Sequence, residues 1–327
     1  MNDLDSLVSY FETAFREELQ KIAQTTPQRL YEPITYSLKI GGKRIRPALL
    51  LHAASLFTNS IEPMLPAAMA IEIFHNFTLL HDDIMDKADV RRNQPTVHKK
   101  YSENVAILSG DAMSILAFKY FAKGNQQLLA DLLPLFSATA IEVCEGQQYD
   151  MDFESRDMVT VEEYLEMIRL KTAVLIAGSL KIGALLANAT QSDSDLLYDY
   201  GINVGLAFQL QDDWLDVYGN PDVFGKRQGG DICSNKKTYL LIKAIQDSDP
   251  TSLKTLKDWL SKTNFDPDDK INAITSIYDK AGVSIAARDL MKNYHDQALK
   301  ALDKIDLPPE RKTTLITFAG EVMERIK

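Results

Sequence analysis

The chain has 327 residues, of which 45% are hydrophobic and 25% are charged, and its formal net charge is −10. This composition excludes a wholly disordered, collagen-like or coiled-coil chain, and the acidic balance argues against a nucleic-acid partner. The two cysteines, Cys144 and Cys233, form no CxxC pair. This excludes a disulfide framework or a zinc ribbon and favours the reducing cytoplasm.

Helical periodicity begins near the N-terminus and dominates the chain. Apolar residues from Leu4 to Phe15 share one helical face, without the basic and apolar segments of a secretory signal. The most apolar stretch, 172–189, is interrupted by Lys181 and predicts a buried core helix, not a membrane span. Further helices are expected over 44–58, 65–86, 103–123, 127–154, 160–189 and 194–218, with shorter ones in 236–326.

Few breaks separate the predicted helices. A Gly41-Gly42 pair precedes the basic segment KRIRP, a second basic stretch spans 87–102, and the segment 219–235 is rich in glycine. No Ser/Gly linker or change of composition divides the chain. The sequence therefore predicts a single all-α domain over 1–327, with basic loops and acidic helix ends gathered at one place.

An aspartate pattern occurs twice, each time at the end of an apolar helix. LLHDDIMD contains Asp82, Asp83 and Asp86, and QLQDDWLD contains Asp212, Asp213 and Asp216. Positions i and i+4 share a helix face, where like charges destabilise an isolated helix by roughly 0.2–0.5 kcal/mol, and they oppose the helix dipole. A divalent cation would relieve both penalties, and all-oxygen ligands favour Mg²⁺. One copy alone would suit a solvated helix end, but two copies indicate a metal site.

Basic clusters accompany the aspartates and are suited to phosphate. Arginine can contact phosphate in a bidentate manner, whereas lysine acts as a mobile point charge. Any one cluster alone would more often be a solvated face, but cations beside acidic motifs predict a site for a polyanion and a metal. The cluster residues are Lys43, Arg44 and Arg46; Arg91 and Arg92; Lys171 and Thr172; and Lys226, Arg227, Lys236 and Lys237.

Other catalytic patterns fail. Glu72 and His75 form an ExxH, but no second ExxH completes a di-iron site. The sequence contains no phosphate-binding GxxxxGK[ST] loop, no GxSxG nucleophile elbow and no HExxH. Nucleophilic Ser/His/Asp catalysis therefore has no support.

These segments together resemble the trans-isoprenyl (polyprenyl) diphosphate synthases. The matching segments, over about 40 to 240, are GGKRIRP, LLHDDIMDKADVRRNQPTVH, GDA at 110–112, GQQYDMD at 146–152, KT at 171–172, and FQLQDDWLDVYG followed by GKRQGGD. The resemblance implies an isoprenoid synthase-type helical bundle around a deep central cavity, a homodimer, and head-to-tail condensation of isopentenyl diphosphate with an allylic diphosphate.

The resemblance also implies a role for each matching residue. Asp82, Asp86 and Asp212 would be the principal ligands of three Mg²⁺ ions, with Asp83, Asp213 and Asp216 as direct or supporting ligands. The isopentenyl diphosphate site would contain Lys43, Arg46, His75 and Arg92. The allylic diphosphate would contact Arg91, Lys171, Thr172, Gln209, Lys226 and Lys236. Thr172 and Gln209 could also stabilise a carbocation, and the departing pyrophosphate would take the final proton.

Chain length is expected to depend on the helix that carries the first motif. Phe77 lies five residues before Asp82 and Thr78 four residues before it, with Phe74 one turn deeper. An aromatic at Phe77 could be the floor of the tunnel for the growing product, as in archaeal-type geranylgeranyl synthases, which this pattern resembles. The predicted product is C15 to C20, leaning to C20. The alternative is that Phe77 is ordinary core and the floor lies elsewhere.

Two other functions remain open at this stage. A class I terpene cyclase shares one DDxxD but would not need the second diphosphate site that GGKRIRP implies. A non-catalytic subunit of a heteromeric synthase would commonly have lost an aspartate motif, and both are intact here. The 219–235 segment is expected to be a flap over the allylic diphosphate. A role for the C-terminal Arg325 and Lys327 stays open.

Overall fold

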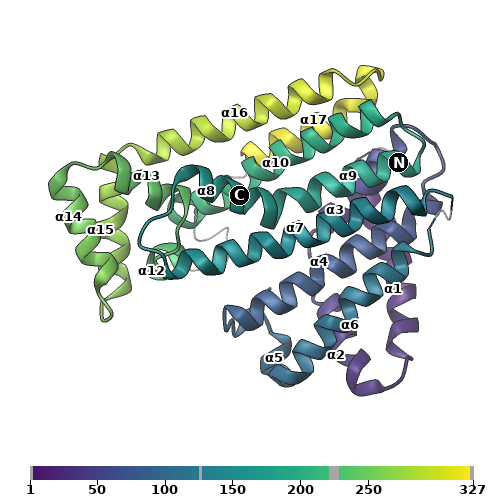
Figure 1. The fold of residues 1–327 in the computed structure, drawn as a ribbon, viewed down its shortest axis with the longest axis horizontal. Coiled ribbons are helices and arrows are strands. Elements are labelled where there is room, and N and C mark those ends of the chain that lie inside the picture. Colours follow the sequence, from purple (N-terminus) through teal and green to yellow (C-terminus); the bar gives the residue numbers. More distant parts are fainter. Residues whose placement is uncertain (1–2, 125–126, 221–227, 325–327) are drawn as a thin grey trace. The chain divides into compact units, whose positions relative to one another are not determined.

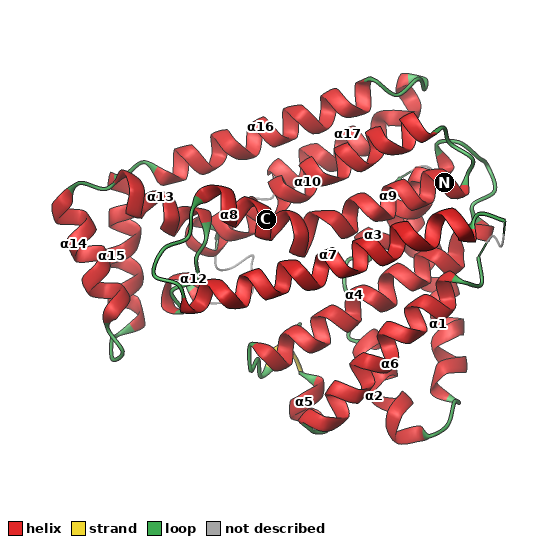
Figure 2. Ribbon diagram, in the orientation of Figure 1, coloured by secondary structure: helices red, strands yellow, loops and turns green. Residues whose placement is uncertain are grey.

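A computed structural model describes residues 3–124, 127–220 and 228–324. Within these ranges nearly all regular structure is helical (Figure 2). Two compact units are present, one formed by Met1–Ala140 with Gly178–Leu197 and the other by Ile141–Ala177 with Tyr198–Lys327. Among the described residues no helix is both long enough and apolar enough to cross a bilayer.

The first unit is built around α4, which packs along α6 (Figure 1). Helix α4 is buried on most sides because its first half is almost entirely apolar. Helix α1 covers this core with one face, where Leu7, Phe11, Phe15 and Leu19 recur at helical spacing. The elements are α1 (Leu4–Ala23), α2 (Gln28–Lys39), α3 (Ile45–Ser55), η1 (Glu62–Met64), α4 (Leu65–Met85), β1 (Val90–Arg91), β2 (Gln94–Pro95), α5 (Val97–Lys100) and α6 (Glu103–Phe121).

Three helices contribute residues to both units: α7 (Leu129–Ser155), α9 (Val174–Leu186) and α10 (Gln191–Tyr218). Side-chain caps begin several helices of the second unit. Thr160 forms a capping box before α8, and Thr238, Asp249 and Asp266 cap α13, α14 and α15. Its other elements are α8 (Val161–Ile168), η2 (Arg169–Ala173), α12 (Gly230–Cys233), α13 (Tyr239–Asp247), α14 (Pro250–Ser261), α15 (Pro267–Lys280), α16 (Val283–Asp303) and α17 (Pro309–Glu324).

The all-α prediction is confirmed, with two local differences. The helix expected over 160–189 consists of α8, a π-helical turn and α9. The basic segment after the first aspartate motif contains a two-residue antiparallel pair, in which Arg91 lies opposite Gln94. Both differences occur where predicted site residues lie.

Candidate active site

The first aspartate motif lies at the C-terminal end of α4, and its three carboxylates differ in burial and in hydrogen bonding. The Asp86 amide donates to the Asp82 carbonyl at 2.8 Å, so both residues belong to the last turn. Asp83 is buried, and its Oδ1 accepts from Arg91 Nε and Nη2, both at 2.8 Å. Burial raises the pKa of Asp83 even though Arg91 opposes the shift. Asp83 therefore fixes Arg91, while Asp86 is exposed and Asp82 is half-buried.

The second motif, in the other unit, resembles the first in its middle aspartate. Asp213 is buried and accepts from Tyr164 Oη at 2.5 Å and from Gln209 Nε2 at 3.0 Å. Burial raises the pKa of Asp213 to about 7. The outer residue Asp216 accepts from the Asp231 amide at 3.0 Å, and burial raises its pKa as well.

Lys171 and Thr172 lie in the π-helical turn, a feature that is frequent at functional sites. Lys171 Nζ donates to Asp150 Oδ2 at 2.6 Å, and Thr172 Oγ1 donates to Gln209 Oε1 at 3.0 Å. Because Gln209 donates in turn to Asp213, the π-helical turn and the second motif share one hydrogen-bonded network. Gly146 of α7 makes room for this turn, since a Cβ there would lie 2.3 Å from the Lys171 amide nitrogen.

A cationic cluster occupies the first unit around His75. Arg46 Nη1 lies 3.2 Å from His75 Nε2. Burial is the main cause that holds the pKa of His75 well below its usual value, and the nearby charges of Arg46 and Arg92 add to it. His75 is therefore a neutral imidazole among guanidinium groups. Gly42 allows this arrangement, because a Cβ there would lie 2.6 Å from Arg92 Nη1. Lys43, three residues before Arg46 in the chain, is exposed.

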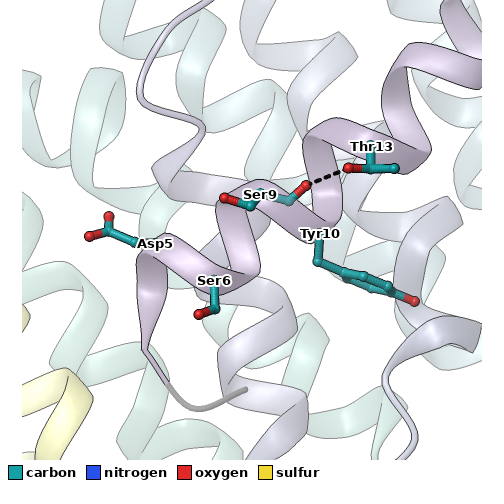
Figure 3. Close-up of a pocket in the computed structure, with 5 residues that line it drawn as sticks. All are labelled: Asp5, Ser6, Ser9, Tyr10 and Thr13. Atoms are coloured by element: carbon teal, nitrogen blue, oxygen red, sulfur yellow. Dashed lines mark hydrogen bonds between the residues drawn. The ribbon is translucent and has the colours of Figure 1, made fainter.

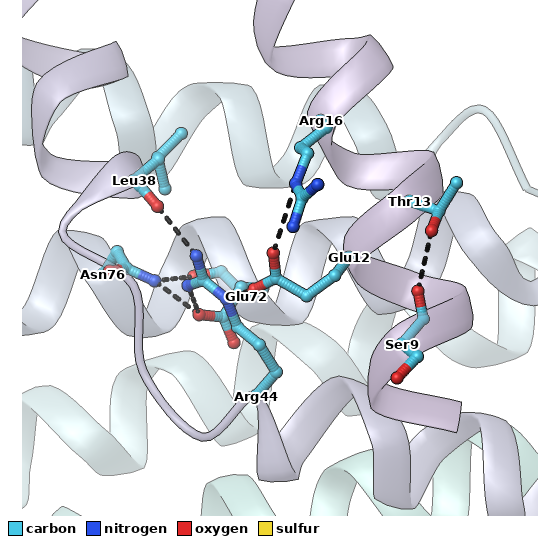
Figure 4. A network of polar contacts seen from close by, with 8 residues as sticks. All are labelled: Ser9, Glu12, Thr13, Arg16, Leu38, Arg44, Glu72 and Asn76. Carbon is cyan, nitrogen blue, oxygen red and sulfur yellow. Dashed lines mark hydrogen bonds and ion pairs between the residues drawn. The ribbon is translucent and has the colours of Figure 1, made fainter. Parts of the chain in front are cut away.

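Arg44 differs from the phosphate contact that its basic segment suggested. It is buried in a left-handed conformation with φ of 49°. Its Nε donates to Glu12 Oε1 at 2.7 Å and its Nη2 to the Leu38 carbonyl at 2.8 Å, and it forms an ion pair with Glu72 (Figure 4). Asn76 Nδ2 also donates to Glu72 Oε1. Arg44 therefore ties α1 and α4 together, and Glu72 of the ExxH pattern serves this network.

The predicted chain-length residues lie in an aromatic cluster. The Phe77 ring centroid is 5.4 Å from that of Phe74, which in turn lies 5.8 Å from that of Phe136. Phe77 is half-buried and packs against the buried Phe74. Thr78 is also half-buried and donates to the His75 carbonyl at 2.8 Å.

Lys236 follows the short helix α12 and is exposed. Its charge lowers the pKa of both Asp213 and Asp216, although burial of the two carboxyls outweighs it. Lys236 therefore lies close to the second motif. The predicted residues Lys226 and Arg227, and the C-terminal Arg325 and Lys327, lie outside the described residues.

Several partners of the site were missed from the sequence. Asp150 lies within the GQQYDMD segment, but that segment does not indicate the ion pair between Asp150 and Lys171. Tyr164 precedes Asp213 by 49 residues, and no motif signals their hydrogen bond. Asp231, in the glycine-rich segment, donates a hydrogen bond from its backbone amide to Asp216.

The two aspartate motifs supply the oxygen ligands that a magnesium ion prefers. No group of three or more His, Cys, Asp or Glu side chains is already assembled around a common point in the described ranges. Each motif nevertheless offers outer carboxylates at i and i+4, and Mg²⁺ is commonly held by one or two carboxylates with water and substrate phosphates. The donor set therefore fits a magnesium ion that arrives with a diphosphate.

A shallow hollow on α1 is unrelated to these residues. It is lined by Asp5, Ser6, Ser9, Tyr10 and Thr13, and Thr13 Oγ1 donates to the Ser9 carbonyl at 2.9 Å (Figure 3). None of the predicted site residues lines it.

Comparison with known proteins agrees with the motif resemblance. A family model described as polyprenyl synthetase matches residues 27–278. A geranylgeranyl diphosphate synthase of Methanosarcina mazei is 38% identical over 304 residues, covering 92% of this chain and 91% of that protein. A geranylfarnesyl diphosphate synthase of Natronomonas pharaonis is 37% identical over 307 residues, covering 88% and 86%. A crystal structure of a geranylgeranyl pyrophosphate synthase superimposes with a TM-score of 0.92 at 45% identity, covering 99% of each chain.

Proposed function

Because the chain belongs to the polyprenyl synthetase family and is a trans-prenyltransferase with the all-α isoprenoid synthase fold, we propose that it condenses isopentenyl diphosphate with allylic diphosphates, head to tail, to a C15–C20 prenyl diphosphate. Geranylgeranyl diphosphate (C20) is the expected main product. The observation that carries the proposal is that the two aspartate motifs share the same local arrangement at the C-terminal part of a helix. In each, the middle aspartate is buried and hydrogen-bonded to protein donors.

The first unit would bind isopentenyl diphosphate. The residues proposed for it are Lys43, Arg46, His75 and Arg92. A neutral His75 can donate or accept a hydrogen bond without adding charge, while Arg46 supplies a planar cation suited to phosphate. The Arg92 guanidinium lies close to Gly42, where a side chain would clash with it. This cluster supports a dedicated second diphosphate site, which a class I cyclase would not need.

The allylic diphosphate would contact residues that the structure holds in place through ion pairs and hydrogen bonds. Asp150 orients Lys171, and Asp83 orients Arg91. Thr172 and Gln209 are hydrogen-bonded to each other, so their oxygens are pre-positioned beside the second motif. We propose that these oxygens stabilise positive charge as it develops on the allylic carbon. Lys236 and Lys226 complete the proposed set.

Asp82, Asp86 and Asp212 would be the main ligands of magnesium, which the resemblance puts at three ions, with Asp216 beside them. Bound magnesium would neutralise the diphosphate leaving group so that the allylic C–O bond can ionise. The protein's own part is to present these carboxylates at fixed spacing. Asp83 and Asp213, which accept hydrogen bonds from Arg91 and from Tyr164 and Gln209 respectively, would act by holding the C-terminal part of each helix in place.

We also propose that both units form one polyprenyl synthase domain over 1–327, and that the chain is a cytoplasmic homodimer. The family model supports the first point, because its match includes residues of both units.

Helix α6 supports the dimer, since Leu108 and Ile115 are 59% and 70% exposed on one face, where a second copy would cover them. Light scattering should give twice the chain mass, and a monomeric mass would contradict the dimer. The use of only two cysteines, without a CxxC, supports the cytoplasm.

The test is release of pyrophosphate from an allylic diphosphate in the presence of Mg²⁺, with and without isopentenyl diphosphate. We expect release that depends on isopentenyl diphosphate and consumes it. Asp82→Ala and Asp212→Ala should each lower turnover by about 10³-fold or more with the fold intact, because charge neutralisation at the leaving group is lost.

The matched control is Asp89→Ala. Asp89 is an exposed carboxylate just after the first motif, paired with Lys99 at 2.8 Å, and its loss should leave turnover within about twofold because surface pairs contribute little. Near-normal rates in both motif variants would overturn the metal assignment. Release that does not consume isopentenyl diphosphate would indicate a cyclase, and no release would indicate a non-catalytic subunit.

A further inference from the structure

Lys270, in the first turn of α15, is a fully buried lysine that no motif explains. Its Nζ donates to Asn235 Oδ1 at 2.6 Å and to the Cys233 carbonyl at 3.2 Å, and it lies 4.2 Å from the centroid of the Phe265 ring. Burying a charged group is unfavourable unless its partners compensate it. Among the described residues, Lys270 is compensated by two neutral oxygens and an aromatic ring, so its hydrogen bonds to Asn235 and Cys233 are important for the local structure.

Both partners belong to the short segment that leads to Lys236. Cys233 ends α12, and Asn235 adopts the left-handed conformation with φ of 58°. The Asn235 carboxamide is held at both ends, because its Oδ1 accepts from Lys270 while its Nδ2 donates to the Leu260 carbonyl at 3.0 Å. This turn directly precedes Lys236, so its conformation sets where the next residue begins.

The other end of the segment is attached to the second aspartate motif. Asp216 Oδ2 accepts from the Asp231 amide, and the Lys236 amide donates to the Asp231 carbonyl at 2.9 Å. Gly229 permits the approach from α15, since its φ is 79° and a Cβ there would lie 2.6 Å from the Ile271 side chain. The segment 229–236 is thus held by Asp216 on one side and by α14 and α15 on the other.

We propose that Lys270 is a positioning residue for allylic diphosphate binding. Acting through Asn235, it holds Lys236 beside Asp213 and Asp216, and so it sets the affinity for the allylic substrate without touching it. The inference rests on the proposed role of Lys236. It adds that α15, outside all the motifs, determines how well that lysine can act.

The first test is Lys270→Met, which keeps a long side chain and removes the charge and the hydrogen-bond donors. We expect the KM for the allylic diphosphate to rise about tenfold, the effect of one lost hydrogen bond to a charged group, with the KM for isopentenyl diphosphate within twofold. The control is Lys312→Met. Lys312 is also a buried lysine of the second unit, donating to the Asp303 carbonyl at 3.1 Å, and its loss should leave both KM values unchanged.

A double-mutant cycle distinguishes positioning from general destabilisation. If Lys270 acts through Lys236, then Lys270→Met should add nothing to the allylic KM of Lys236→Met. An equal rise in both backgrounds would overturn the inference. An unchanged allylic KM in Lys236→Met would overturn the role of Lys236 and the inference with it, whereas pyrophosphate release dependent on isopentenyl diphosphate would still establish the reaction.

A second variant covers the case in which Lys270→Met does not fold. Asn235→Gly keeps the left-handed turn, because glycine adopts positive φ without strain, and it removes both side-chain hydrogen bonds. We expect the same selective rise in the allylic KM. If Asn235→Gly leaves this KM unchanged while Lys236→Met raises it, the inference is wrong and the proposed function stands.

Discussion

At the scale of single residues, the aspartates within each DDxxD motif have different environments. The middle aspartates, Asp83 and Asp213, are buried and accept hydrogen bonds from protein donors. The first aspartate of each motif is half-buried. The two copies use different donors, since Arg91 serves the first and Tyr164 with Gln209 the second. The common feature is therefore a fixed helix end, reached by separate contacts in each unit.

The buried carboxyl of Asp213 predicts a pH effect on stability. Burial raises its pKa to about 7, from 3.8 in the unfolded chain, so the folded state binds its proton more tightly. The contribution of Asp213 to the free energy of unfolding is therefore fully present below about pH 4 and is lost as the pH rises through about 7.

Thermal unfolding without divalent cations checks this effect. The difference in Tm between the wild type and Asp213→Asn should shift steadily against the wild type from pH 4 to pH 7 and then level off. A difference that is constant across this range would contradict the raised pKa of Asp213. Asp89→Asn, at an exposed carboxylate, serves as the control.

At the scale of elements, the π-helical turn depends on a glycine from another helix. A Cβ at residue 146 would lie 2.3 Å from the Lys171 amide nitrogen and 2.7 Å from the Leu170 carbonyl carbon, both backbone atoms that cannot rotate away. Gly146→Ala should therefore destabilise the fold by about 1–3 kcal/mol through overpacking and weaken allylic diphosphate binding. Urea unfolding and the allylic KM measure the two effects.

Gly320 of α17 provides the matched control for this substitution. Nothing lies within 4 Å of a Cβ built at that position, and the residue is helical. Gly320→Ala should stabilise the protein by about 1 kcal/mol, since alanine is the better helix former. If the two alanine variants behaved alike, the close approach of α7 to the π-helical turn would not be needed.

Phe77 of α4 is the residue expected to limit the length of the product. Removing its ring should leave space next to Phe74, whose own ring packs against Phe136. Phe77→Ala should therefore shift the product from C20 to C25 or longer, read by mass spectrometry. The control is Phe118→Ala, because Phe118 also packs against Phe136. An unchanged distribution for Phe77→Ala would place the floor elsewhere.

At the scale of the whole molecule, periodicity predicted the all-α architecture, because long apolar faces at helical spacing need a helical partner surface. The expected helix over 103–123 is found at Glu103–Phe121, and that over 194–218 at Gln191–Tyr218. The reaction class followed from the motifs and is confirmed by the family match. The individual site roles stay predictions.

What could not be predicted depends on contacts between distant segments. The π-helical turn needs the space left by Gly146, 25 residues before Lys171, and no local propensity around Lys171 indicates this. Arg44 and Arg46 lie in the same basic segment, yet only the fold puts Glu12 and Glu72 around Arg44. The role of Lys270 arises in the same way, since Asn235 lies 35 residues before it.

The central claim is that this chain extends allylic diphosphates with isopentenyl diphosphate to a short product. The most direct measurement is mass spectrometry of the products formed from isopentenyl diphosphate with the C5, C10 and C15 allylic diphosphates, each with Mg²⁺. We predict one C20 product from all three primers. Products of C30 or longer would contradict the chain-length argument, and no consumption of isopentenyl diphosphate with any primer would contradict the proposed reaction itself.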